Sequence, residues 1–255
     1  MKNKLHRYFV ACGLILNFTG HIQAAPSVWP MPAELPSVPP GEDSATYPMP
    51  RLDWVQRVKN NNEKAQAQAS AIQLVFDGDS ITDAWQSKGR EIWDARYARF
   101  NAFDFGISGD RTEHLLWRLS QGQVADLHPK LIALMIGTNN MGANTVEQIA
   151  GGVQAVVADY RQRCPDAVIL LQAIFPRGHE ATDPVRTKIK AVNQIISKLD
   201  DGHKVIYVDF GDKFLEADGT LSSEIMPDFL HPNAKGYQIW AEAIQPFIDK
   251  YLGKS

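Results

Sequence analysis

Short apolar runs and amphipathic segments alternate through most of the chain. Apolar runs of four to eight residues, bounded by polar residues or glycine, are typical of buried strands. The expected strands cover residues 72–76, 100–105, 131–136, 167–174 and 205–208. Residues 131–136 are apolar at every position, which is typical of a parallel sheet covered on both faces.

Between these runs, apolar residues recur at helical spacing. The expected helices cover residues 52–67, 90–99, 112–119, 145–163, 183–199 and 234–251. Thr145, followed by Gln148 three positions later, predicts a capping box at the start of one helix. The alternation predicts an α/β fold, a three-layer α/β/α sandwich around a five-stranded parallel sheet. Ligands of such sheets bind beyond the carboxyl ends of the strands.

The first fifty residues follow another pattern. A basic start, an apolar stretch over 8–19 and small residues up to Ala25 predict a signal peptide over residues 1–25. The apolar stretch is too short to span a bilayer, so we expect a secreted or periplasmic protein without stable membrane insertion. An uncleaved anchor and a lipoprotein at Cys12 are the alternatives. Residues 26–50 hold eight prolines and predict an extended arm, which leaves residues 51–255 as one folded domain.

Composition fits one sizeable globular domain. The chain has 255 residues, 44% hydrophobic and 22% charged, with a net charge of −3. Cleavage of the leader removes three positive charges and no negative ones, which brings the net charge to −6. Without a basic cluster, nucleic acid is not an expected partner. Cys164 is then the only cysteine left, and we interpret it as a structural thiol.

A serine follows the first expected strand. Gly78 permits a tight turn there, and Ser80 sits where a helix can begin. Free amides at a helix start favour an anion, so Ser80 is placed to attack a carbonyl carbon. Taken alone, a serine in this position is more often only a helix cap.

An aspartate and a histidine precede the last expected helix. His231 has the chemistry of a general base for serine, and Asp228 is close enough to fix its tautomer. Pro232 disfavours helix at His231 and so predicts a loop. A surface turn or a pair of metal ligands is the alternative. The other histidines lack ligand spacing with this pair, so we expect no metal and no cofactor.

Gly109 and Asn139 follow two further expected strands. Gly109 can offer an unshielded backbone amide, and Asn139 its side-chain NH₂, to the oxyanion of a tetrahedral intermediate. A turn glycine and a loop asparagine are the alternatives. Since parallel strands bring their carboxyl ends to one edge, the two residues and Ser80 are expected to lie together.

These stretches resemble the SGNH (GDSL) hydrolase superfamily, and within it the catalytic subunits of intracellular platelet-activating-factor acetylhydrolase. The resemblance rests on GDS at 78–80, FGISGDRTEHLLWRL at 105–119, GTNN at 137–140, FPRG at 175–178 and DFLH at 228–231. It implies a flavodoxin-like sandwich. It also implies a nucleophile, base and orienting carboxylate at Ser80, His231 and Asp228, and an oxyanion hole made by Ser80, Gly109 and Asn139. The positions that match the small acyl pocket are Ile81, Thr138 and Leu230.

The resemblance and the leader together predict an exported serine esterase for acetyl or other short acyl groups, with O-acetylated carbohydrate as the expected substrate. A lysophospholipase, thioesterase or lipid acetylhydrolase is one alternative, and a non-catalytic carbohydrate-binding protein is another. The chain departs from the animal enzymes at Asp77, where an apolar residue is more usual. Those enzymes are dimers, which leaves a homodimer open here. Among the aromatic residues, we expect Trp93 and Trp117 in the core and Trp85 at the rim of the site.

Overall fold

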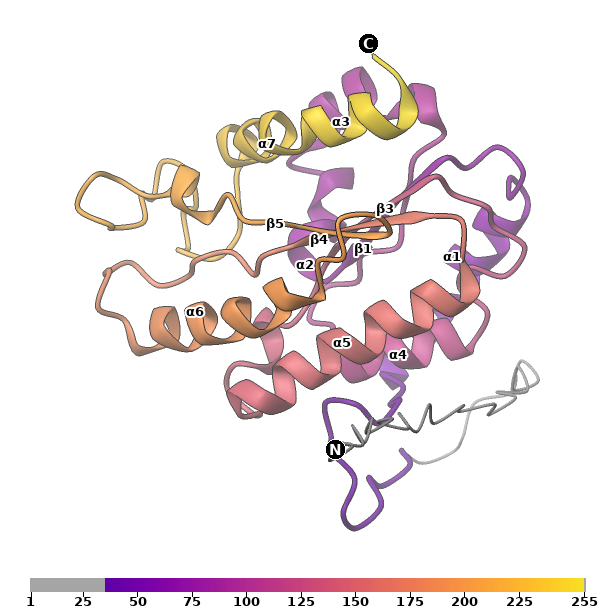
Figure 1. The fold of residues 1–255 in the computed structure, drawn as a ribbon, viewed down its shortest axis with the longest axis horizontal. Helices are drawn as coiled ribbons and strands as arrows, with labels where there is room; N and C mark the ends of the chain where they lie inside the picture. Colours follow the sequence, from indigo (N-terminus) through magenta and orange to yellow (C-terminus); the bar gives the residue numbers. More distant parts are fainter. Residues whose placement is uncertain (1–34, 255) are drawn as a thin grey trace, which may run out of the picture.

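The computed structural model describes residues 35–254, and its centre is a parallel β-sheet (Figure 1). Among these residues the sheet has five strands in the order β2-β1-β3-β4-β5, all parallel. The strands are β1 (Leu74–Gly78), β2 (Phe103–Asp104), β3 (Leu131–Met135), β4 (Val168–Gln172) and β5 (Val205–Val208). The predicted α/β class and five-stranded parallel sheet are therefore confirmed.

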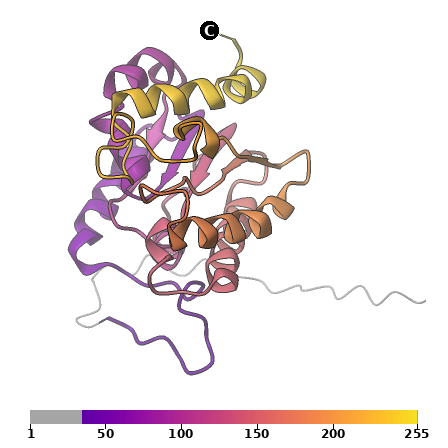
Figure 2. The ribbon, with the colours of Figure 1, turned by 90° about the vertical axis from the view of Figure 1, so that its left-hand side faces the viewer.

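Helices cover both faces of the sheet and make three layers (Figures 1 and 2). One layer holds α1 (Val55–Gln66), α4 (Thr112–Ser120), α5 (Val146–Arg163) and α6 (Pro184–Ile196). The other holds α3 (Arg90–Arg96) and α7 (Ala234–Leu252), with the short α2 (Ser80–Asp83) directly after β1. The 3₁₀ turns are η1 (Leu52–Trp54), η2 (Ala84–Gln86), η3 (Ala98–Phe100), η4 (Thr138–Asn140), η5 (Ser197–Leu199) and η6 (Gly211–Phe214).

The alternation of side chains along the strands produces two cores. Val75 and Ile132 point into the core under α4, α5 and α6, whereas Leu74 and Phe76 point into the core under α3 and α7. Both faces of β1, β3 and β4 are buried, which explains why their sequences are nearly continuous apolar runs.

The helix ends follow from local sequence. The predicted capping box is present at α5, where Thr145 Oγ1 accepts from the Gln148 N–H and Gln148 Oε1 accepts from the Thr145 N–H. Asn233 caps α7 by accepting from the Lys235 and Gly236 amides. One predicted boundary is wrong: only Phe103 and Asp104 of the expected strand 100–105 pair with β1. Phe100 instead ends η3, because Asn101 turns the chain with a left-handed φ of 48°.

The described part of the proline-rich segment, residues 35–50, forms neither helix nor strand and packs beside the start of α4. Thr112 Oγ1 donates to the Ala45 carbonyl at 2.7 Å, and the Met49 N–H donates to the Glu113 carbonyl at 3.1 Å. Ala45 is fully buried. The predicted leader over 1–25 and residues 26–34 of the predicted arm lie outside the described residues.

Two features of the fold bear on where a ligand can bind. After β1 the chain adds β2 on one side of it and then β3 on the other side. Open α/β sheets bind ligands at such a switch point in strand order. No helix within residues 35–254 is both long and apolar enough to cross a bilayer.

Candidate active site

Ser80 is the first residue of α2 and follows β1 at the switch point. Asp79 caps this helix, because its Oδ1 accepts from the Ile81 N–H at 2.9 Å. Gly78 ends β1 so close to the Met135 carbonyl and the Thr82 side chain that a Cβ would collide with both. Only glycine therefore allows the sharp strand-to-helix turn that presents the Ser80 hydroxyl.

His231 lies on the loop before α7, as Pro232 predicted. Asp228 shapes this loop: its Oδ1 accepts from the Leu230 N–H at 3.1 Å and the His231 N–H at 2.7 Å. Phe229 between them has a φ of 56°, which is strained for a bulky residue. Backbone bonds from Phe229 N to Met226 O and from Gly178 N to Phe229 O hold that conformation. The loop is therefore a fixed turn that aims the imidazole.

The structure brings Ser80, His231 and Asp228 together as a chain of hydrogen bonds. Ser80 Oγ lies 2.9 Å from His231 Nε2, and His231 Nδ1 lies 2.6 Å from Asp228 Oδ2. Both distances are in the range that proton transfer and tautomer selection need. The His231 side chain is 29% exposed, so the base is accessible to substrate and water.

The Asp228 carboxylate remains charged over the whole physiological range. Burial by itself would raise its pKa, but the His231 ring and the backbone amides of His231 and Leu230 donate to it and lower the pKa to about 2. A carboxylate in this state stabilises an imidazolium on His231.

Gly109 and Asn139 lie on the loops after β2 and β3. Gly109 has a φ of 79°, and its N–H has no backbone acceptor among the described residues. Asn139 Nδ2 donates to the Asp110 carbonyl at 2.9 Å, which fixes its amide and leaves a second hydrogen for a ligand. Each group thus keeps a hydrogen that a ligand can accept, and their role in an oxyanion hole stays a prediction.

Two arginines that sequence reasoning did not single out hold the loop after β2. Arg118 is buried under the site; its Nε lies 2.8 Å from Asp110 Oδ2, and its Nη2 lies 2.9 Å from Asp77 Oδ1. Arg51 Nη1 donates to the Ser108 carbonyl at 2.6 Å. Asp77, which the sequence analysis noted as unusual, is therefore an ion-pair partner of Arg118. An acidic residue at the end of an apolar strand was the one sign in the sequence of a buried cation nearby.

Burial changes the protonation of two carboxyl groups near Ser80. Burial raises the pKa of Asp79 to about 7, helped by the nearby Asp110 charge and opposed by the Ile81 N–H and Arg177. Burial raises the pKa of Asp110 to about 6, although Arg118 and Arg51 act against it. Asp79 Oδ2 is buried without a hydrogen-bond partner, which agrees with a protonated carboxyl group at mildly acidic pH.

The residues predicted for an acyl pocket differ in their exposure and surroundings. Ile81 and Thr138 are buried to 1% and 3% exposure, and Leu230 lines a hollow of about 590 Å³ with Arg177 and Phe229. Their predicted role stays a prediction.

The expectation for Trp85 is wrong: Trp85 is fully buried against Phe76, Tyr237 and Trp240. Its ring faces inward because α2 and η2 lie on the aromatic core. Trp93 is buried as expected, and Trp117 is half-buried.

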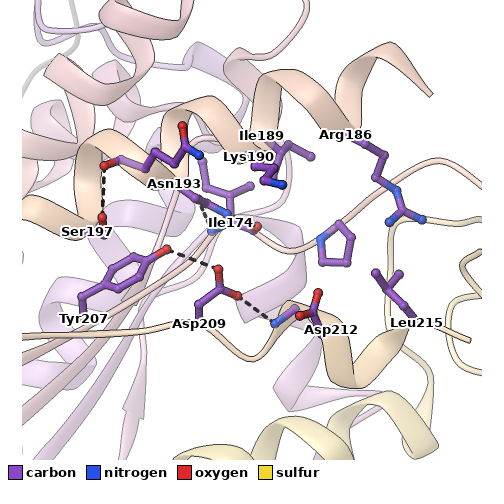
Figure 3. Close-up of a pocket in the computed structure, with 13 residues that line it drawn as sticks. Ile174, Arg186, Ile189, Lys190, Asn193, Ser197, Tyr207, Asp209, Asp212 and Leu215 are labelled. Atoms are coloured by element: carbon purple, nitrogen blue, oxygen red, sulfur yellow. Dashed lines mark hydrogen bonds between the residues drawn. The ribbon is translucent and has the colours of Figure 1, made fainter. Parts of the chain in front are cut away.

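Ser80 and His231 open onto a cleft of about 490 Å³, which is also lined by Ser108 and by the polar residues Gln86, Ser87 and Lys88. A separate hollow of about 460 Å³ lies between β5 and α6 (Figure 3). It is lined by Tyr207, Asp209 and Lys190 and contains none of the predicted site residues. Within residues 35–254, no three side chains of metal-binding type are gathered as a metal site.

The chain is similar to known proteins in sequence and in fold. The chain is 34% identical over 183 residues to human platelet-activating factor acetylhydrolase IB subunit alpha1, covering 71% of this chain and 78% of that protein. A GDSL-like lipase structure from Bacteroides thetaiotaomicron matches with a TM-score of 0.63 and 21% identity over 76% of this chain and 97% of its own. The acetylxylan esterase Axe2 from Geobacillus stearothermophilus matches with a TM-score of 0.56 and 19% identity, over 72% and 95%.

The fold, the site and these relatives define the chain as a carboxylic ester hydrolase. It belongs to the GDSL-like lipase/acylhydrolase family, whose model matches residues 76–239. That match spans the turn at Ser80, both donor loops and the loop that carries His231.

Proposed function

We propose that the chain is an exported serine esterase that removes acetyl or other short acyl groups from O-acetylated carbohydrate. The observation that carries the proposal is the hydrogen-bonded series from Ser80 through His231 to Asp228, at 2.9 and 2.6 Å. Support for the substrate comes from the polar cleft beside Ser80 and from the likeness in fold to an acetylxylan esterase.

In the proposed mechanism, Ser80 Oγ attacks the ester carbonyl carbon while His231 Nε2 takes its proton. Asp228 holds the imidazole and stabilises its positive charge. The backbone amides of Ser80 and Gly109 and the Asn139 amide donate to the oxyanion. His231 then protonates the departing alcohol oxygen, leaving an acyl-enzyme. A water that gives its proton to His231 attacks the acyl carbon, and Ser80 leaves with that proton.

The test of this chemistry is Ser80→Ala, with Ser87→Ala as the matched control from the same cleft. We expect Ser80→Ala to lower turnover of p-nitrophenyl acetate by at least about 10³-fold. Ser87→Ala should keep most of the activity, because Ser87 has no bond to His231. Unchanged turnover in Ser80→Ala would refute the assignment of the nucleophile.

A second candidate is a lipid acetylhydrolase, favoured by the identity of 34% to a platelet-activating factor acetylhydrolase subunit. The preferred length of the acyl chain, and the kind of alcohol from which it is released, distinguish the two candidates. A carbohydrate acetyl esterase should lose activity from p-nitrophenyl acetate to octanoate and release acetate from acetylated glycans faster than from acetylated phospholipids. The reverse preference would favour the lipid enzyme.

Export rests on the sequence pattern of residues 1–25. Expression with this leader in a bacterial host, followed by N-terminal sequencing of the exported protein, tests it. We expect a mature chain that begins just after Ala24 or Ala25. Retention of the whole chain in the cytoplasm with Met1 intact would contradict it.

A further inference from the structure

The cleft at Ser80 does not end beside the nucleophile. A second hollow of about 730 Å³ lies between the first turns of α3 and α7 and the loop of residues 216–225. Ser87 and Lys88 line both this hollow and the cleft that holds Ser80 and His231. The two hollows are therefore neighbours that share Ser87 and Lys88 in their linings, and each has a volume within the about 300–1,000 Å³ typical of ligand sites.

The backbone beside the shared residues is packed closely against the core. Gly89 approaches the Trp85 and Tyr237 rings so tightly that a Cβ there would lie 3.0 Å from Tyr237 and closer still to Trp85. The Ser87 and Gly89 amides both donate to the Ala84 carbonyl. The backbone of residues 87–89 thus rests on the aromatic core at Gly89, while the exposed Ser87 and Lys88 border both hollows.

The lining of the second hollow indicates the kind of occupant. Three glutamates, Glu91, Glu216 and Glu224, face it together with Lys88, Lys235 and Gln238. Hydrogen-bonding groups of both signs are spread over both walls, and Lys235 Nζ pairs with Glu224 Oε2 at 3.1 Å. The apolar part of the lining comes from Ile92, Ile225, Ala234 and Ile239, and the three isoleucines pack against the core under α3 and α7. An anionic polymer would meet an excess of glutamate, whereas a neutral sugar chain has hydroxyls for the donors and acceptors of this lining and apolar ring faces for its isoleucines.

We propose that the hollow between α3 and α7 binds the sugar units next to the acetylated one, so that the enzyme acts on acetylated oligomers of neutral sugars. This inference rests on the proposed carbohydrate esterase function. In the proposed complex the acetylated unit lies over Ser80 and His231, and the chain continues over Ser87 and Lys88 towards Gln238 of α7.

The test uses acetylated xylo-oligosaccharides from disaccharide to hexasaccharide and three variants of the full chain. Gln238→Trp places a bulky ring in the hollow, Gln238→Ala removes one hydrogen-bonding group, and Lys190→Trp places the same ring in the unrelated hollow of Figure 3. Thermal unfolding of each variant shows whether it folds. The quantity compared is kcat/KM for the hexasaccharide divided by kcat/KM for the disaccharide.

We expect this ratio to exceed about ten in the natural chain and in Lys190→Trp, since each added hydrogen bond contributes a several-fold gain in binding. It should fall to about one in Gln238→Trp and by about two- to fivefold in Gln238→Ala. A ratio near one in the natural chain, or a ratio that survives in Gln238→Trp, would overturn the proposal.

A binding measurement separates this inference from the proposed function. Ser80→Ala should bind the unacetylated hexasaccharide in calorimetry, and Ser80→Ala combined with Gln238→Trp should not. If no acetylated glycan is hydrolysed but this binding is found, the proposed esterase function is wrong and the proposed sugar-binding site is supported. If short acetylated sugars are hydrolysed but the hexasaccharide does not bind, the proposed sugar-binding site is wrong and the esterase function is supported.

Discussion

Arg51 Nη1 lies 2.6 Å from the carbonyl oxygen of Ser108. The acceptor is the other end of the peptide unit whose N–H belongs to Gly109, one of the proposed oxyanion donors. A cation on the carbonyl oxygen of an amide draws electron density from its nitrogen and strengthens the N–H as a donor. Gly109 also makes this contact sterically feasible, because a Cβ at that position would lie 2.7 Å from Arg51 Nη1.

Replacing Arg51 by methionine should therefore weaken turnover more than substrate binding. We expect kcat for p-nitrophenyl acetate to fall about tenfold, the scale of one charge-assisted hydrogen bond that acts in the transition state, with KM changed much less. The control is Asp53→Asn, which removes the exposed ion-pair partner of Arg51. Steady-state kinetics of both variants test this role of Arg51. A rise in KM at constant kcat would show that Arg51 does not act through the Gly109 amide.

Asn139 supplies the second donor that the proposed mechanism needs. Its Nδ2 is held by the Asp110 carbonyl at 2.9 Å, so the amide is oriented before substrate arrives. Asn139→Ala should lower kcat by about 10²–10³ with a small change in KM. Asn139→Asp keeps the size of the side chain but cannot donate, and it should be equally impaired. Near-normal kcat in the aspartate variant would rule out the donor role.

Arg118 should matter for stability as well as for the site. Its guanidinium is 2% exposed and lies between the buried carboxylates of Asp77 and Asp110. Arg118→Met leaves those carboxylates without their cation, which should cost about 3–5 kcal/mol in the free energy of unfolding. Urea denaturation measures this cost. Arg90→Met removes an exposed pair with Asp94 and should leave the midpoint almost unchanged; equal losses in the two variants would contradict the argument.

Much of the fold followed from periodicity. Strands β1, β3 and β4 are buried on both faces, so their apolar runs were easily recognised, and the capping box at Thr145 fixed the start of α5. Strand β2 was harder because its two residues are half-buried at the sheet edge. The meeting of Ser80 with His231 was predictable because each predicted strand or helix carried its polar residue at the same edge.

The rest depended on contacts between residues far apart in the chain. Trp85 follows Ser80 by five residues, and only the packing of η2 on α7 shows that its ring points into the core. Arg51 precedes the expected catalytic segments, and nothing in its own neighbourhood indicates that it reaches Ser108, 57 residues later. The sequence alone does not distinguish Gly89 from an ordinary loop glycine, because its close approach to the Trp85 and Tyr237 rings is visible only in the structure.

Asp79 gives the fold a stability that depends on pH. Its carboxyl group has a pKa of 3.8 in an unfolded chain and about 7 in the folded one, mainly because burial disfavours the charged form. Between those values the folded chain holds a proton that the unfolded chain has released, so the free energy of unfolding falls as pH rises. Asp110 acts in the same direction. His114 acts in the opposite one, because burial and nearby arginines lower its pKa to about 3.

Asp79→Asn isolates the contribution of Asp79 from those other groups. The asparagine oxygen can still accept from the Ile81 N–H, and its uncharged NH₂ takes the place of the buried Oδ2. In urea unfolding, the free energy of unfolding of the variant should lie within about 1 kcal/mol of that of the natural chain at about pH 4.5 and exceed it by about 4 kcal/mol at about pH 7.5. The exposed Asp53→Asn should shift neither value. A difference between variant and natural chain that is the same at both pH values would mean that Asp79 does not titrate in this range, and that its buried carboxylate is instead stabilised by charge from Arg177.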